Sequence, residues 1–117
     1  MEINGILMRY IFLLAVMTVL SSAVTAQNFT DCEVVDIRFG SQAENAHVLL
    51  NCTIIGLPDC GTGSYVGFDK TTESGKQYLS LFLTAFAGNF KVRGTVQQDC
   101  PTWQTNVALL ESVVLKK

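Results

Sequence analysis

Residues 74–89 read Ser-Gly-Lys-Gln-Tyr-Leu-Ser-Leu-Phe-Leu-Thr-Ala-Phe-Ala-Gly-Asn. Apolar side chains recur in this stretch every three or four residues, which predicts an α-helix with one broad apolar face. Ser74 and Gln77 have the spacing of a capping box at the start of the helix, and Gly88-Asn89 suit a left-handed turn at its end. Further apolar residues widen the face, so we expect the helix to be buried on most sides against a sheet.

The chain begins with a segment that has the layout of a secretory signal peptide. A short polar start ends at Arg9, and the apolar run Tyr10–Leu20 is followed by small residues up to Ala26. This run is shorter than the roughly 20 residues that a membrane-spanning helix needs. We therefore expect residues 1–26 to be a signal peptide and residues 27–117 to be a single domain, with no stable membrane insertion after cleavage.

The charge of the chain is small and slightly negative. It carries 8 Lys and Arg against 10 Asp and Glu, a formal net charge of −2, and the basic residues form no cluster. Binding to nucleic acid depends on clustered Lys and Arg that neutralise phosphates. Nucleic acid is therefore not an expected partner.

All four cysteines lie after the leader, and an even number of cysteines in a small exported chain predicts two disulfides. Cys32 and Cys52 are each ten residues from Gln42, the middle of an expected turn, so an antiparallel hairpin would place them opposite each other. This favours a Cys32–Cys52 bridge and leaves Cys60 with Cys100. Cys52–Cys60 is the rival pairing, because these two residues are close in the sequence.

Alternation of apolar and polar residues, bounded by turn residues, predicts five strands around the helix. Gly67, in the third strand, indicates a bulge or a close backbone approach. The order strand-strand-strand-helix-strand-strand is that of the OB-fold, a mainly β, five-stranded barrel. The structural alternative is an open α+β sheet with the helix across one face. The five expected strands are Cys32–Phe39, Ala46–Ile55, Ser64–Asp69, Phe90–Gln97 and Thr105–Leu115.

The sequence resembles a group of small secreted bacterial proteins related to the B subunit of subtilase cytotoxin, an AB5-type toxin. The resemblance rests on Phe68-Asp69, the run Gly75–Ala85, Lys91-Val92, Cys60 with Cys100, and the apolar last strand. It implies an OB-like fold and a Cys60–Cys100 bridge. The toxin subunit assembles as a ring of five and binds cell-surface glycans, but none of its glycan-contacting residues can be carried over to this sequence. The additional cysteine pair departs from the simpler members of the group.

Catalytic and metal-binding patterns are weak. His47 is the only histidine, has no cysteine or histidine partner at ligand spacing, and is accompanied by no nucleophile motif. The acidic residues are more typical of solvated faces and helix caps than of an acid–base pair. We therefore expect no enzymatic activity, no metal and no cofactor.

The candidate ligand-binding residues are centred on Trp103, in the expected loop between the fourth and fifth strands. Trp103, the only tryptophan, could stack on a sugar ring, and Tyr65, Gln104 and Asn106 could supply further contacts. In OB-folds this loop borders the usual ligand face. Alternatively, Trp103 covers the end of the barrel beside the disulfide.

These patterns predict a secreted or periplasmic, non-catalytic binding module that recognises a cell-surface glycan or a protein partner. If the resemblance to the toxin subunit extends to assembly, the chain forms a homo-oligomer, a pentamer. The alternative is a stand-alone secreted protein with a structural or inhibitory role and no glycan site.

Overall fold

The computed structural model describes residues 27–117. The expected signal peptide, residues 1–26, lies outside the described residues. In the described part the chain is mainly β, with one helix and two disulfides. No helix there combines the length and the apolar character that crossing a bilayer requires.

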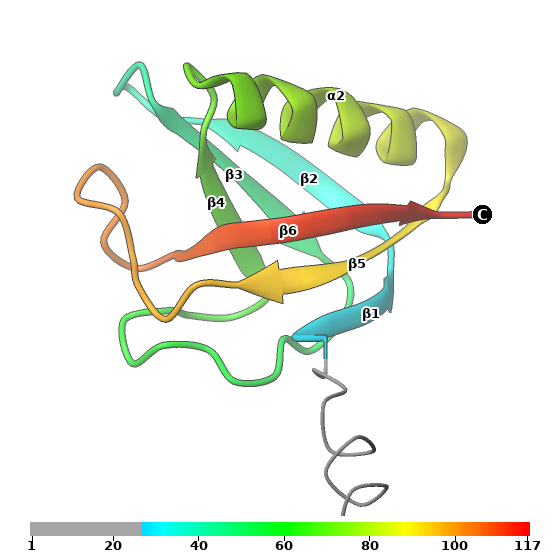
Figure 1. Cartoon of the computed structure of the whole chain (residues 1–117), viewed down its shortest axis with the longest axis horizontal. Coiled ribbons are helices and arrows are strands. Elements are labelled where there is room, and N and C mark those ends of the chain that lie inside the picture. Colours follow the sequence, from blue (N-terminus) through cyan, green and yellow to red (C-terminus); the bar gives the residue numbers. More distant parts are fainter. Residues whose placement is uncertain (1–26) are drawn as a thin grey trace, which may run out of the picture.

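Six strands form one sheet in the order β1-β5-β6-β4-β3-β2, with α2 packed across it (Figure 1). Neighbouring strands are antiparallel except β4 and β6, which are parallel. The helix contacts β2, β4 and β6. The elements are β1 (Phe29–Cys32), β2 (Val34–Phe39), β3 (Asn45–Leu50), β4 (Tyr65–Asp69), α2 (Glu73–Gly88), β5 (Lys91–Val96) and β6 (Ala108–Lys116).

The expected first strand, Cys32–Phe39, corresponds to β2, and a further strand that the sequence did not predict, β1, precedes it and shares only Cys32 with it. β1 and β2 are separated only by Glu33, yet they form the two opposite edges of the sheet. Because consecutive residues occupy both edges, the sheet curls until its edges approach each other at Glu33. Within residues 27–117 no ladder joins β1 to β2, so the sheet is not the closed five-stranded barrel that the sequence predicts.

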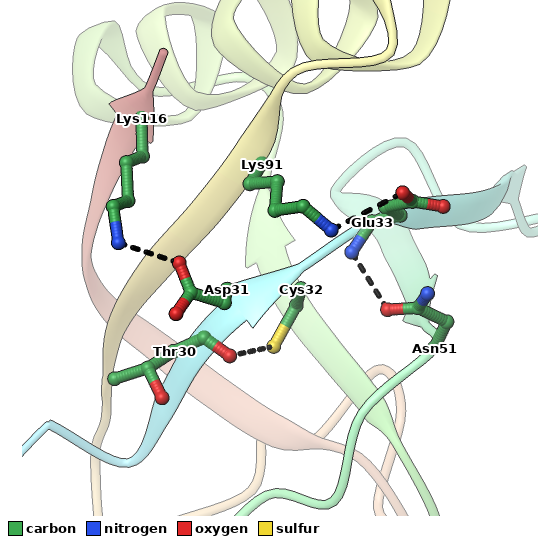
Figure 2. Close-up of polar contacts among 7 residues, drawn as sticks. All are labelled: Thr30, Asp31, Cys32, Glu33, Asn51, Lys91 and Lys116. Carbon is green, nitrogen blue, oxygen red and sulfur yellow. Dashed lines mark hydrogen bonds and ion pairs between the residues drawn. The ribbon is translucent and has the colours of Figure 1, made fainter.

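The break at Glu33 is fixed by polar contacts (Figure 2). The Glu33 N–H donates to Asn51 Oδ1 at 2.7 Å, and the Asn51 N–H donates to the Glu33 carbonyl at 3.0 Å. Lys91 reaches the Glu33 carboxylate at 3.3 Å, and Lys116 reaches Asp31 at 2.6 Å. Asp31 has a φ of 51°, in the left-handed region, which redirects the chain just before the break. Asn51 therefore holds Glu33 in place through these two hydrogen bonds, and β3 ends at Leu50 instead of continuing to the expected Ile55.

The helix is confirmed almost at its expected limits, but its start and its burial differ. The N-cap is Thr72, whose Oγ1 accepts from the Gly75 N–H at 2.9 Å, so the expected capping box at Ser74 is wrong by two residues. The left-handed C-cap at Asn89, with a φ of 55°, is confirmed. Gly75 lies against the chain leaving β4, where an added Cβ would be 1.7 Å from the Asp69 carbonyl oxygen.

The expectation that the helix is buried on most sides is also wrong. Only Gly75, Phe82 and Ala85 are fully buried in α2, whereas Leu83 and Phe86 are 49% and 52% exposed. The described residues cover the helix only on the side that contacts β2, β4 and β6. The Phe82 ring stacks on Phe68 of β4 with centroids 5.8 Å apart, which fixes that face to the core.

The disulfides are Cys32–Cys52 and Cys60–Cys100, so the favoured pairing is confirmed and the rival Cys52–Cys60 pairing is excluded. Cys32–Cys52 joins β1 to the segment after β3. Cys60–Cys100 joins the long loops that precede β4 and β6. Two disulfides indicate that this chain folds in an oxidising, extracytoplasmic environment.

Candidate functional site

A surface pocket of about 210 Å³ lies where β2, β3 and β4 meet the loop before β6. Tyr65, Gln104 and Asn106, three of the four candidate residues, line it together. The sequence did not identify its remaining polar lining, which is Arg38, His47 and Thr62. The pocket is thus built from three strands and two loops that are far apart in the sequence.

Side-chain amides form a hydrogen-bonded relay along the pocket. Asn45 Nδ2 donates to Gln104 Oε1 at 2.9 Å, and Gln104 Nε2 donates to Asn106 Oδ1 at 2.7 Å. Asn45 is the one buried polar residue of the described core, with 5% of its surface exposed. Gln104 accepts through its oxygen and donates through its nitrogen, so the relay fixes the orientation of the Gln104 amide.

The relay continues to His47 and sets the position of its proton. His47 Nδ1 lies 3.1 Å from Asn45 Oδ1. Because the Asn45 nitrogen already serves Gln104, its oxygen must accept here, so Nδ1 carries the proton and Nε2 of the neutral ring is an acceptor. Burial lowers the pKa of His47 below its ordinary value of 6.5, and Arg38 lowers that pKa further, while Asp36 acts in the opposite direction. The neutral ring is therefore the form present at pH 7.

Tyr65 is held by contacts with two of its neighbours in the pocket. Its ring meets the His47 ring edge-on, with centroids 5.7 Å apart and an interplanar angle of 64°. The Arg38 guanidinium carbon lies 6.0 Å from the Tyr65 centroid, within reach of a cation–π contact. Arg38 is itself fixed by Asp36, to which its Nε donates at 2.6 Å. The aromatic surface of Tyr65 thus has a defined orientation.

The two loops at the pocket are anchored to each other. Cys60–Cys100 links them covalently, and the Thr62 N–H and Oγ1 both donate to the Asn106 carbonyl, at 3.1 and 2.9 Å. The Gln104 N–H donates to the Pro101 carbonyl at 3.3 Å. A rigid loop keeps Gln104 and Asn106 in place before any ligand arrives.

Trp103 lies outside this pocket. It is half-buried and lines a separate hollow of about 240 Å³ with Gln42, Glu44 and Thr102. An added Cβ on Gly67 would lie 3.6 Å from Trp103 Cη2 and 3.1 Å from a Val107 methyl carbon. Gly67 therefore allows close approach of these side chains to β4, whose pairing with β3 has no bulge. The structure does not bring Trp103 together with the other three candidates.

Among residues 27–117 no group of three or more His, Cys, Asp and Glu residues is placed to hold a metal ion. Likewise, no buried side-chain nitrogen or oxygen of the described residues lacks a hydrogen-bond partner. The polar groups of the pocket offer donors and acceptors in fixed positions.

Comparison of the chain with protein families, curated proteins and solved structures finds no match.

Proposed function

We propose that this chain is an exported, non-catalytic carbohydrate-binding module and that its site is the pocket lined by Arg38, His47, Tyr65, Gln104 and Asn106. The observation that carries the proposal is the oriented relay from His47 through Asn45 and Gln104 to Asn106. Small-molecule sites combine an apolar surface with a few polar groups in fixed positions. This pocket has both.

The chemistry of the lining suits a sugar. A sugar ring presents hydroxyl groups, each of which donates and accepts, and an apolar C–H face. The amide nitrogen of Asn106 and the guanidinium of Arg38 are donors, and His47 Nε2 is an acceptor. Tyr65 offers a rigid aromatic surface that loses little conformational entropy on binding.

The size of the pocket limits the ligand. About 210 Å³ is below the roughly 300–1,000 Å³ typical of pockets for drug-sized ligands. We therefore propose that the pocket holds a single sugar ring, with the rest of a glycan extending into solvent.

The topology supports this location. We propose that the curled sheet is an opened OB-type barrel in which β1 and β2 together are one strand bent at Glu33. Five strands then remain, the helix lies between the third and fourth, and the third and fifth are parallel neighbours. In OB-folds the loop between the last two strands borders the ligand face, and here that loop carries Gln104 and Asn106.

A protein partner is the second candidate. The observation that favours it is the exposure of Leu83 and Phe86 on α2, since exposed apolar side chains on a helix can seat another protein. Under this alternative the protein has a structural or inhibitory role and the pocket binds no sugar.

A glycan array followed by calorimetry on the best hit tests the proposal. Tyr65→Ala and Gln104→Ala should each weaken binding about tenfold, the effect of losing roughly 1.4 kcal/mol of aromatic or hydrogen-bonding contact. Gln42→Ala, at the hollow beside Trp103, is the matched control and should leave the affinity unchanged. Absence of any glycan ligand, or binding unaffected by both pocket variants, would reject the proposed site.

A further inference from the structure

The strand β2 lies at the edge of the sheet, where one side of its backbone has no neighbouring strand within residues 27–117. Exposed edge strands can pair with another chain, and natural proteins protect them with charged side chains, proline or bulges. β2 has no proline, its two charges are of opposite sign, and its one irregularity lies at its start, between Val34 and Asp36. Its residues 35–39 read Val-Asp-Ile-Arg-Phe.

The backbone of β2 directs alternate residues toward the open side. Arg38 is paired with His47 of β3, and the Gly40 N–H donates to the Asn45 carbonyl just beyond the ladder at 3.4 Å. Even-numbered residues therefore turn their N–H and C=O groups toward β3. Ile37 and Phe39 turn theirs toward the open edge, because these directions alternate along a strand.

The side chains of this segment are complementary to a second copy of themselves. Antiparallel pairing about a two-fold axis at Ile37 places Asp36 opposite Arg38 of the other copy, and Arg38 opposite its Asp36. Both side chains are accessible, at 39% and 54% exposure. We propose that two copies of this chain associate through antiparallel β2–β2 pairing centred on Ile37.

Charge selects this register over its neighbours. A shift of the two-fold axis to Arg38 would place two arginines opposite each other, and a shift to Asp36 would do the same with two aspartates. Like charges directly opposite each other are destabilising, whereas opposite charges stabilise a cross-strand pair. In the Ile37 register the Asp36–Arg38 pairs occupy the non-hydrogen-bonded positions, where facing side chains are closest.

The apolar residues fit the same pairing. Val35 and Phe39 are 50% and 56% exposed, unusually high for large apolar residues in a strand. The two-fold axis at Ile37 places each Val35 opposite a Phe39 of the other copy. The pairing therefore covers four exposed apolar side chains along with the four charges.

The contact is short. A register shift between Val34 and Asp36 interrupts the regular strand, so only about five residues of each copy can pair. Such an interface is smaller than the roughly 800 Å² per partner of a standard stable complex. The dimer should therefore dissociate on dilution. It would also place two of the proposed sugar pockets on one face, a consequence that rests on the proposed function and provides avidity for a multivalent surface.

Sedimentation velocity over a concentration series tests the proposal, on protein produced from the full-length coding sequence so that processing takes place. The wild type should be a reversible dimer. Asp36→Arg and Arg38→Asp should each raise the dimer dissociation constant at least about tenfold, since two attractive pairs become repulsive. Asp59→Arg makes the same charge change in an exposed loop and should leave the dimer intact.

Mixing the two single variants distinguishes a loss of β2–β2 pairing from a general effect of the charge change on solubility or folding. Asp36→Arg and Arg38→Asp proteins, each monomeric alone, should form a heterodimer when mixed, and the double variant carrying both changes should dimerise again. A monomer at every concentration, a ring of five, a dimer indifferent to Asp36→Arg, or variants that fail to associate on mixing would each overturn the proposal. None of these results depends on whether the pocket binds sugar.

Discussion

Replacing Asn45 with alanine removes the centre of the pocket relay. Asn45 donates to Gln104 and accepts from His47, and it is 5% exposed. Its side chain also lies over the bare backbone of Gly40, where an added Cβ would be 2.3 Å from Asn45 Nδ2. Asn45→Ala therefore deletes two hydrogen bonds and a packing contact at the junction of β2, β3 and the loop before β6.

The expected loss of unfolding free energy follows from these contacts. Each side-chain hydrogen bond contributes about 1 kcal/mol net, so two of them with the lost packing amount to about 2–3 kcal/mol. For a domain of this size each kcal/mol lowers Tm by about 4–8 °C, which gives a decrease of roughly 10–20 °C. Gln104 and His47 also lose the partner that orients them, so sugar binding should weaken as well.

Urea unfolding followed by circular dichroism measures the effect, with the midpoint expected to fall while the slope stays constant. Gln98→Ala is the matched control, because the Gln98 side-chain amide donates an even shorter hydrogen bond, 2.7 Å to the Gly56 carbonyl, at an exposed position. It should cost less than about 0.5 kcal/mol. If Asn45→Ala costs no more than Gln98→Ala, the relay does not stabilise the fold and the reasoning is wrong.

Four further outcomes are expected. Gly75→Ala should destabilise the protein by about 1–3 kcal/mol or more, because the new Cβ would meet the Asp69 backbone. In the same urea experiment Gly88→Ala should cost less, because its Cβ would meet only the Phe90 ring, which can move. Folding lowers the pKa of His47, so the stability linked to its neutral form is complete above pH 6.5 and is lost as the pH falls below that value. The free energy of unfolding should therefore decrease less between pH 7 and pH 5 in His47→Gln than in the wild type. Removing Cys60–Cys100, whose cysteines are 40 positions apart, should cost about 4 kcal/mol in the chain-entropy model, and removing Cys32–Cys52, 20 positions apart, about 3 kcal/mol. Only the loss of Cys60–Cys100 should also loosen the pocket loops in hydrogen exchange. Trp103 fluorescence should not change when a sugar occupies the pocket, because Trp103 lines a different hollow; a large shift would place it in the site.

The helix could be predicted because its periodicity is a local sequence pattern, and the disulfides because two of the cysteines lie symmetrically about a turn. The 3.6-residue periodicity of residues 74–89 defines the helix almost to its ends. The positions of Cys32 and Cys52 around Gln42 predicted their pairing, and the ladder at that end keeps the same symmetry, with Val34 opposite Leu50. Alternation continues through residues 32–39, so it gave no sign of the break at Glu33, which depends on Asn51 and on the backbone of Asp31.

The pocket could be predicted only in part, for a reason that lies in the register. After the shift between Val34 and Asp36, Arg38 is opposite His47, one residue away from the symmetric pairing about Gln42. That shift decides which side chains of β2 and β3 meet, and no local pattern reveals it. The chemistry of Trp103 made it a candidate for sugar binding, whereas its position depends on its close approach to Gly67.

The pairing of β1 with β5 sets the order in which the chain can become structured. Phe29 is opposite Gly94, 65 positions later, and Asp31 binds Lys116, 85 positions later. The first strand therefore has no place to dock until nearly all of the polypeptide has left the ribosome. Contacts between distant residues slow folding, so we expect the edge formed by β1 to assemble after the locally paired strands β2, β3 and β4.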